Sequence, residues 1–149
     1  MRCPAMKRRK RKWRMANSEW RRCLNDQPIN SYRDLRVWQD ATSLAEACYR
    51  LTRPFPREEL FGLTSQIRRS AGSIPANIAE GHGRENTGSF VQSLRIAQGS
   101  LKELETHLIL AQRIGFSQAS EIQSSLAECE SLGKMVRALI RSLQDKSSK

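Results

Sequence analysis

The residues of this sequence with the clearest chemical potential are basic and lie near its start. Residues 1–14 hold eight lysines and arginines and no acidic residue, a local charge of +8. Positive side chains attract phosphate groups, and an aromatic ring can stack on a base. The candidate nucleic-acid contacts in this segment are Lys7, Arg8, Arg9, Lys10, Arg11, Lys12, Trp13 and Arg14.

A block of like charge with few apolar residues repels itself and has little surface to bury. We therefore expect residues 1–30 to form a basic, disordered N-terminal arm that precedes the folded domain. An alternative is that translation starts at Met15, in which case the most basic part of this arm is not made.

Three arginines beyond the arm are further candidates. Arg68 and Arg69 are adjacent, and Arg84 follows an expected turn. Together they could form a phosphate-binding patch on the folded domain. The alternative is that each is an ordinary solvated surface arginine.

The sequence contains no convincing catalytic constellation. Residues 81–84 (GHGR) lack the Lys-Ser/Thr ending of a phosphate-binding loop, and we interpret them as a helix–helix turn. Glu103 and His107 are one helical turn apart, but a di-iron bundle site needs a second Glu-x-x-His motif on another helix. We expect no enzymatic activity and no catalytic residues.

The cysteines also argue against a metal or cofactor. A structural zinc site usually takes closely paired ligands, and this chain has no C-x-x-C pair. We expect no metal, no cofactor and reduced thiols, as is typical of a cytoplasmic protein. The four cysteines are Cys3, Cys23, Cys48 and Cys129.

Apolar residues recur every three or four positions from residue 34 onward, which indicates helices. We expect four of them, over about 34–52, 57–80, 87–114 and 117–143. Short connections between long helices favour antiparallel neighbours. The sequence therefore predicts an all-α, up-down-up-down four-helix bundle over residues 31–145.

Two of these helices carry apolar residues on a second side. On the third helix, Ile96, Leu110 and Ile114 lie opposite the main apolar stripe. On the first helix, Val37, Leu44 and Leu51 recur every seven residues and form a face away from that of Trp38, Ala41, Ala45, Cys48 and Tyr49. A helix that is apolar on two sides usually buries both, which favours a homo-oligomer. The alternative is a wide monomer core.

The overall composition limits the class of protein and its partners. The chain is 38% hydrophobic and 28% charged, with 26 Lys+Arg against 15 Asp+Glu and a net charge of +11. No apolar run approaches the roughly 18 residues of a membrane span, and the basic start lacks the apolar core of a secretory signal. We expect a cytoplasmic protein with polyanionic partners and no membrane contact.

Four sequence runs together resemble one known family. They are residues 32–39 (YRDLRVWQ), 59–67 (ELFGLTSQI), 73–81 (SIPANIAEG) and 97–105 (AQGSLKELE). This combination resembles the bacterial four helix bundle proteins first noticed in intervening sequences of 23S ribosomal RNA genes. The resemblance covers residues 31–143, and residues 1–30 match nothing in it.

The resemblance implies an antiparallel four-helix bundle that assembles into a ring-like homopentamer, with no enzymatic activity attached to the fold. The same family includes the accessory protein of diversity-generating retroelements, a basic barrel that binds nucleic acid and partners a reverse transcriptase. Our hypothesis is an oligomeric bundle that binds RNA or DNA through phosphate contacts. The alternative is a protein-interaction module, such as a reverse-transcriptase accessory subunit.

Overall fold

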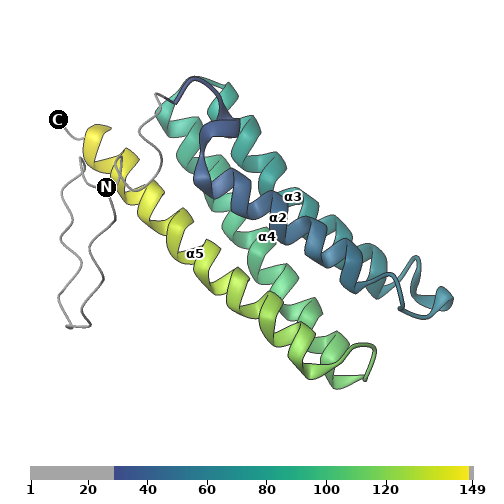
Figure 1. Cartoon of the computed structure of the whole chain (residues 1–149). Helices are drawn as coiled ribbons and strands as arrows, with labels where there is room; N and C mark the ends of the chain where they lie inside the picture. Colours follow the sequence, from purple (N-terminus) through teal and green to yellow (C-terminus); the bar gives the residue numbers. More distant parts are fainter. Residues whose placement is uncertain (1–28, 148–149) are drawn as a thin grey trace, which may run out of the picture.

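The computed structural model describes residues 29–147, which form four long helices (Figure 1). Within this range there is no β-strand, so the predicted all-α, four-helix fold is confirmed. Two short 3-10 turns, η1 (Tyr32–Asp34) and η2 (Arg57–Glu59), precede the first and second helix. The helices are α2 (Arg36–Leu51), α3 (Leu63–Gly83), α4 (Thr87–Arg113) and α5 (Ala119–Ser147).

Successive helices run in opposite directions along the bundle (Figure 1). Helix α3 packs on α2 and α4, and α5 packs on α2 and α4. Gly115 allows the short turn between α4 and α5, because its φ of +81° lies in the left-handed region that side chains disfavour. The predicted arm, residues 1–30, lies almost entirely outside the described residues.

The core runs along the bundle axis and is built from apolar side chains at steps of three and four. Each such side chain contributes about 1.5–3 kcal/mol when it is fully removed from water. All four helices supply residues of this kind, and each helix packs on its two neighbours around the shared core. The largest enclosed side chains are Leu44, Ile67, Ile74, Ile78, Leu94, Leu101, Leu104, Leu108, Ile122, Leu132 and Val136.

The prediction that the first helix has a second apolar side facing outward is wrong. Val37 and Leu44, which we assigned to an outward face, are buried in the core of this chain together with Ala41 and Cys48, and Leu51 is half-buried against the same core. With 3.6 residues per turn the four buried positions fall within about 60° of one another, so they form one stripe. Helix α2 therefore faces the core with this stripe.

The second helix is displaced toward the C-terminus of the chain relative to its predicted bounds. It begins at Leu63, where the Glu59 carboxylate accepts the backbone N–H at 2.9 Å, and it continues through Gly83. The turn to α4 is therefore made by Arg84 to Asn86 and not by residues 81–84. The Asn86 side chain then caps α4 by accepting the backbone N–H of Ser89 at 2.9 Å.

Gly81 lies inside α3 at the point where α3 and α4 approach each other closely. A Cβ built on Gly81 would stand 2.5 Å from Cβ of Ser93 and 3.0 Å from Cδ2 of Phe90, both on α4. Ordinary carbon–carbon contacts are about 3.5–4.0 Å, so no larger residue fits without moving a helix. This glycine sets how closely α3 and α4 pack.

Candidate nucleic-acid interface

The three arginines predicted to form a patch point toward different neighbours. Arg68 turns toward α2: its Nε donates to the Thr52 hydroxyl at 2.9 Å, and its guanidinium lies 4.9 Å from the ring centroid of Tyr49. Arg69 turns toward α4 and donates to Oε1 of Glu103 at 2.8 Å. Neighbours in sequence therefore lie on different sides of α3.

Arg84 is remote from the other two. It follows α3 and forms an ion pair with Glu80 of the same helix. Fifteen residues separate Arg84 from Arg69, which corresponds to roughly 22 Å along a helix. The structure does not bring these three guanidinium groups together, and two of them already have a carboxylate partner.

The basic arm cannot be placed in the same way. Its candidate residues, 7–14, lie outside the described residues 29–147. The prediction that they contact nucleic acid rests on their charge alone.

A second set of cations lies on α4 and α5, and sequence reasoning missed it. On α5 three basic residues are spaced three and four apart, so they share one face. On α4 two basic residues are seven apart and share a face in the same way. All five are exposed. We call this set the α4–α5 basic stripe; it consists of Arg95, Lys102, Lys134, Arg137 and Arg141.

Contacts between the two helices bring the two rows of the stripe together. A Cβ built on Gly133 of α5 would lie 3.3 Å from Leu101 Cδ2 of α4 and 3.4 Å from Nη1 of Arg137. Gly133 is therefore level with Leu101, which precedes Lys102. Because the helices are antiparallel, the pairing of Leu101 with Gly133 places Arg95 at about the level of Leu139, within two residues of Arg141 along the bundle axis.

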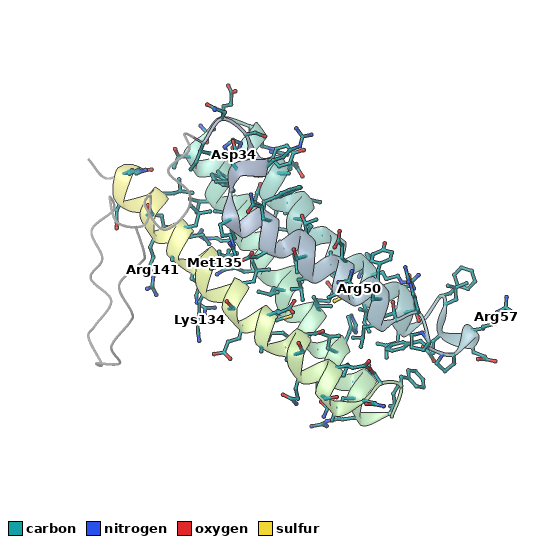
Figure 2. All side chains as sticks on the ribbon, viewed as in Figure 1. Asp34, Arg50, Arg57, Lys134, Met135 and Arg141 are labelled. Atoms are coloured by element: carbon teal, nitrogen blue, oxygen red, sulfur yellow. The ribbon has the colours of Figure 1, made fainter. Side chains whose placement is uncertain are left out.

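The electrostatics of Glu130 agree with this arrangement. The hydrogen bond from Lys134 lowers the pKa of the Glu130 carboxyl, and the charges of Lys102 and Arg137 lower it further. Cations from both helices thus act on one carboxylate. Figure 2 shows Lys134 and Arg141 along the outer side of α5, whereas Arg50 lies on α2 and Arg57 at the opposite end of the view.

The stripe carries the positive excess of the described residues. Residues 29–147 hold 15 Lys and Arg against 13 Asp and Glu, a net charge of +2. The five cations of the stripe and the two carboxylates that bond its lysines, Glu105 and Glu130, give +3. All other described residues together therefore carry −1.

The α3–α4 interface, in contrast, is a polar seam whose groups are mutually bonded. The hydroxyls of Ser73 and Ser100 lie 2.8 Å apart, and the Asn77 amide donates to Oγ of Ser73 at 3.0 Å. Farther along, Glu103 accepts from Arg69 and lies 3.6 Å from Nε2 of His107. The two bonds that cross between the helices, Ser73 to Ser100 and Arg69 to Glu103, fix the register of α3 against α4.

A shallow groove of about 330 Å³ lies beside this seam. Asn77 and Glu80 of α3 and Arg84, which follows that helix, form one side of the groove. Gln92 and Ile96 of α4 form the other side. The Arg84 guanidinium at its edge is paired with Glu80. The groove therefore offers little unbalanced charge to an anion.

The remaining titratable groups do not gather into a site. In the described part of the chain, no three His, Cys, Asp or Glu side chains lie close enough to hold a metal ion. Burial raises the pKa of the Cys48 and Cys129 thiols to about 12, so both are protonated core residues at neutral pH. None of the described helices is long and apolar enough to cross a membrane.

The architecture is that of a four-helix bundle protein. Two of the four sequence runs noted above, residues 73–81 and 97–105, meet across the α3–α4 interface. Ser73 in the run 73–81 bonds Ser100 in the run 97–105, and the first run also holds the close-packed Gly81. A family model described as "23S rRNA-intervening sequence protein" matches residues 33–138. The chain belongs to this family.

A solved structure has the same fold. It is the crystal structure of a protein of unknown function from the S23 ribosomal protein family of Bacteroides thetaiotaomicron, 24% identical in sequence. The match covers 70% of this chain and 97% of the other, with a TM-score of 0.63. At this identity the likeness shows the fold alone. A search of the curated proteins found no significant match.

Proposed function

We propose that this chain is a non-enzymatic, cytoplasmic, homo-oligomeric bundle that binds RNA or DNA through phosphate contacts. The observation that carries the proposal is the unbalanced positive charge of the chain, +11 in total with +8 in residues 1–14. Such a charge attracts polyanions over a long range, and each assembled copy adds to it. Phosphate contacts of this kind discriminate little between base sequences.

A salt titration of binding tests this proposal. The affinity of the full-length protein for a ribosomal RNA fragment and for duplex DNA is measured from 0.05 to 0.3 M salt. We expect a linear fall of log K against log salt, with a slope of about −0.7 to −0.9 for each phosphate contact. A full-length protein that binds neither nucleic acid at the lowest salt refutes the proposal.

A protein that starts at Met15 is the matched comparison, since it lacks only the most basic residues. We expect it to bind with a smaller slope than the full-length protein. Equal slopes for the two proteins would remove Lys7–Arg14 from the interface and leave the contacts to the folded domain.

The homo-oligomer is supported by the outer side of α4. Ile96, Leu110 and Ile114 are 49%, 46% and 50% exposed in the single chain, and they lie on one side of the helix. Exposed apolar residues that share a helix face favour burial against another surface, and we propose that a second copy provides it. The resemblance to the four helix bundle proteins favours a pentamer.

Light scattering tests this assembly with two neighbouring substitutions. We expect Leu110→Gln to shift the protein toward the monomer mass, because residue 110 lies on the proposed interface. Ile109→Gln is the control: residue 109 has a similar exposure, 42%, on another side of α4. A wild-type protein that is monomeric at tens of micromolar contradicts the proposed oligomer.

One observation favours the alternative of a protein-interaction module. Phe61 is 90% exposed and its neighbour Leu60 is 51% exposed, both between α2 and α3. An aromatic side chain of this kind is a common anchor for a protein partner. A reverse transcriptase encoded nearby that co-purifies with the wild type, but not with Phe61→Ser, supports the accessory-subunit function.

A further inference from the structure

We propose that the α4–α5 basic stripe is the surface through which the folded domain binds the phosphate backbone of a nucleic acid. This inference rests on the proposed function and assigns it to residues that lie outside the basic arm. The inference is based on two observations: five exposed cations lie on the packed helices α4 and α5, and the other described residues together carry a slight negative charge.

Charge complementarity selects the stripe among the surfaces of the domain. The stripe with its two bonded carboxylates carries +3, whereas the other described residues sum to −1. Arg95, Arg137 and Arg141 have no carboxylate within 4.0 Å among the described residues, so their charges are not cancelled by an ion pair. A polyanion that approaches the folded domain is drawn to this side.

The dimensions of the stripe suit several phosphates at once. Lys134 and Arg141 are seven residues apart, and so are Arg95 and Lys102, which gives each row a length of about 10 Å. Packed helices lie roughly 8–10 Å apart, so the two rows are separated by a similar distance. One strand of B-DNA has a phosphate about every 3.4 Å along the axis, so a row spans about three of them.

The side chains of the stripe favour phosphate over base recognition. Three of the five are arginines, whose planar guanidinium can donate two parallel hydrogen bonds to one phosphate. Helix α5 has no aromatic residue, and Phe90 of α4 is buried. The other ring of α4, His107, lies 3.6 Å from Oε1 of Glu103, which faces Arg69 of α3 and not the stripe. The stripe therefore offers no ring to stack on a base, and we expect little preference among base sequences.

The basic arm does not compete for this surface. Residues 1–14 have the same sign of charge as the stripe, so the two repel each other and attract the same polyanion. The arm and the stripe therefore act as two contributions to the binding of one nucleic acid.

The test removes three positive charges from α5 in the full-length protein. The variant Lys134→Gln/Arg137→Gln/Arg141→Gln keeps long side chains of good helix propensity on exposed positions, so the fold should be retained. Binding to a ribosomal RNA fragment and to duplex DNA is measured as a function of salt. We expect the slope to fall in magnitude by about 2.1–2.7, which corresponds to a roughly 50- to 170-fold weaker affinity at 0.15 M salt.

The control has the same change of net charge at another place. Arg50→Gln/Arg53→Gln/Arg57→Gln removes three exposed cations from the end of α2 and the segment after it, away from the stripe (Figure 2). We expect this variant to keep nearly the wild-type slope. Equal losses in the two variants overturn the inference, because the net charge and not the stripe would then set the affinity.

A second variant tests whether both rows take part. Arg95→Gln/Lys102→Gln alters only α4, and we expect the magnitude of its slope to fall by about 1.4–1.8. Wild-type slopes in both stripe variants refute the stripe while leaving nucleic-acid binding by the arm intact. A wild-type protein that does not bind at low salt refutes the proposed function and the stripe together.

Discussion

The close approach of α3 and α4 at Gly81 leads to a prediction that can be checked by stability measurements. In Gly81→Ala the new methyl group would lie 2.5 Å from Cβ of Ser93 and 3.0 Å from Cδ2 of Phe90. The Phe90 ring can rotate, but Cβ of Ser93 is bonded to the backbone of α4. To reach an ordinary contact distance, the two helices must separate by about 1 Å.

The expected cost follows from two opposing effects. Extra methyl groups in a packed interface cost about 1–3 kcal/mol, and the upper end applies because a helix has to move. Replacing glycine by alanine inside a helix gains about 1 kcal/mol. We therefore expect Gly81→Ala to destabilise the protein by about 2 kcal/mol, which lowers the Tm of a domain of this size by roughly 8 °C.

Gly72→Ala is the matched control in the same helix. A Cβ built at residue 72 has no neighbouring atom within 4 Å, so only the helix gain of up to about 1 kcal/mol remains. Thermal and chemical unfolding are compared at one protomer concentration, because assembly would shift both. A Gly81→Ala protein as stable as Gly72→Ala would refute the packing argument.

A double-mutant cycle separates this contact from a general loss of stability. Ser93→Gly removes the Cβ that the new methyl group would meet. We expect Gly81→Ala to cost much less in the Ser93→Gly background than in the wild type, with a coupling of at least about 1 kcal/mol. Additive effects of the two changes would contradict the proposed contact.

Three further predictions concern single groups. Because burial raises the pKa of Cys48 and Cys129 from 9.0 to about 12, their contribution to stability is complete below pH 9 and is lost as the pH rises from 9 to 12. Between pH 8 and 10 the wild type should lose about 1.4 kcal/mol per thiol more than the double alanine variant in chemical unfolding. Ser73→Ala should cost about 1–2 kcal/mol by the same measurement, because it leaves the Ser100 hydroxyl without its partner. Ser100→Ala should cost less, because the Ser73 hydroxyl still accepts from the Asn77 amide. Gly115→Ala should cost about 1 kcal/mol, because φ is +81° there; an unchanged midpoint would contradict this.

Local patterns were sufficient to predict the number and order of the helices. Steps of three and four in residues such as Leu94, Ala97 and Leu101 depend only on the helical repeat, and all three are fully buried or nearly so. The ends of the helices were harder to predict. Gly81 and Gly83 suggested a helix end, yet both belong to α3, since Gly81 is needed for its contact with α4.

Which side of a helix faces the core was predicted less well than the existence of the helix. Val37 and Leu44 were separated from Ala41 and Cys48 because the seven-residue spacing suggested a face of its own. The true stripe includes all four residues, and only packing against α3 and α5 shows where its centre lies.

The basic stripe is partly visible in the sequence and partly not. Lys134, Arg137 and Arg141 have the spacing of one helix face, and this signal could have identified them. Their alignment with Lys102 could not be predicted, since those residues are more than thirty positions apart and meet only through the antiparallel contact of α4 with α5. In the same way, Arg68 and Arg69 are adjacent in the chain and end on different sides of α3.

The amino-acid pattern alone specifies four helices, a basic start and membership of a family, because helical periodicity, charge and short motifs are local properties of the chain. The register between helices is not local. It depends on the fit of Gly81 against Ser93, on the bond between Ser73 and Ser100, and on the contact of Gly133 with Leu101. These contacts decide which arginines are paired with carboxylates and which cations form a continuous charged surface.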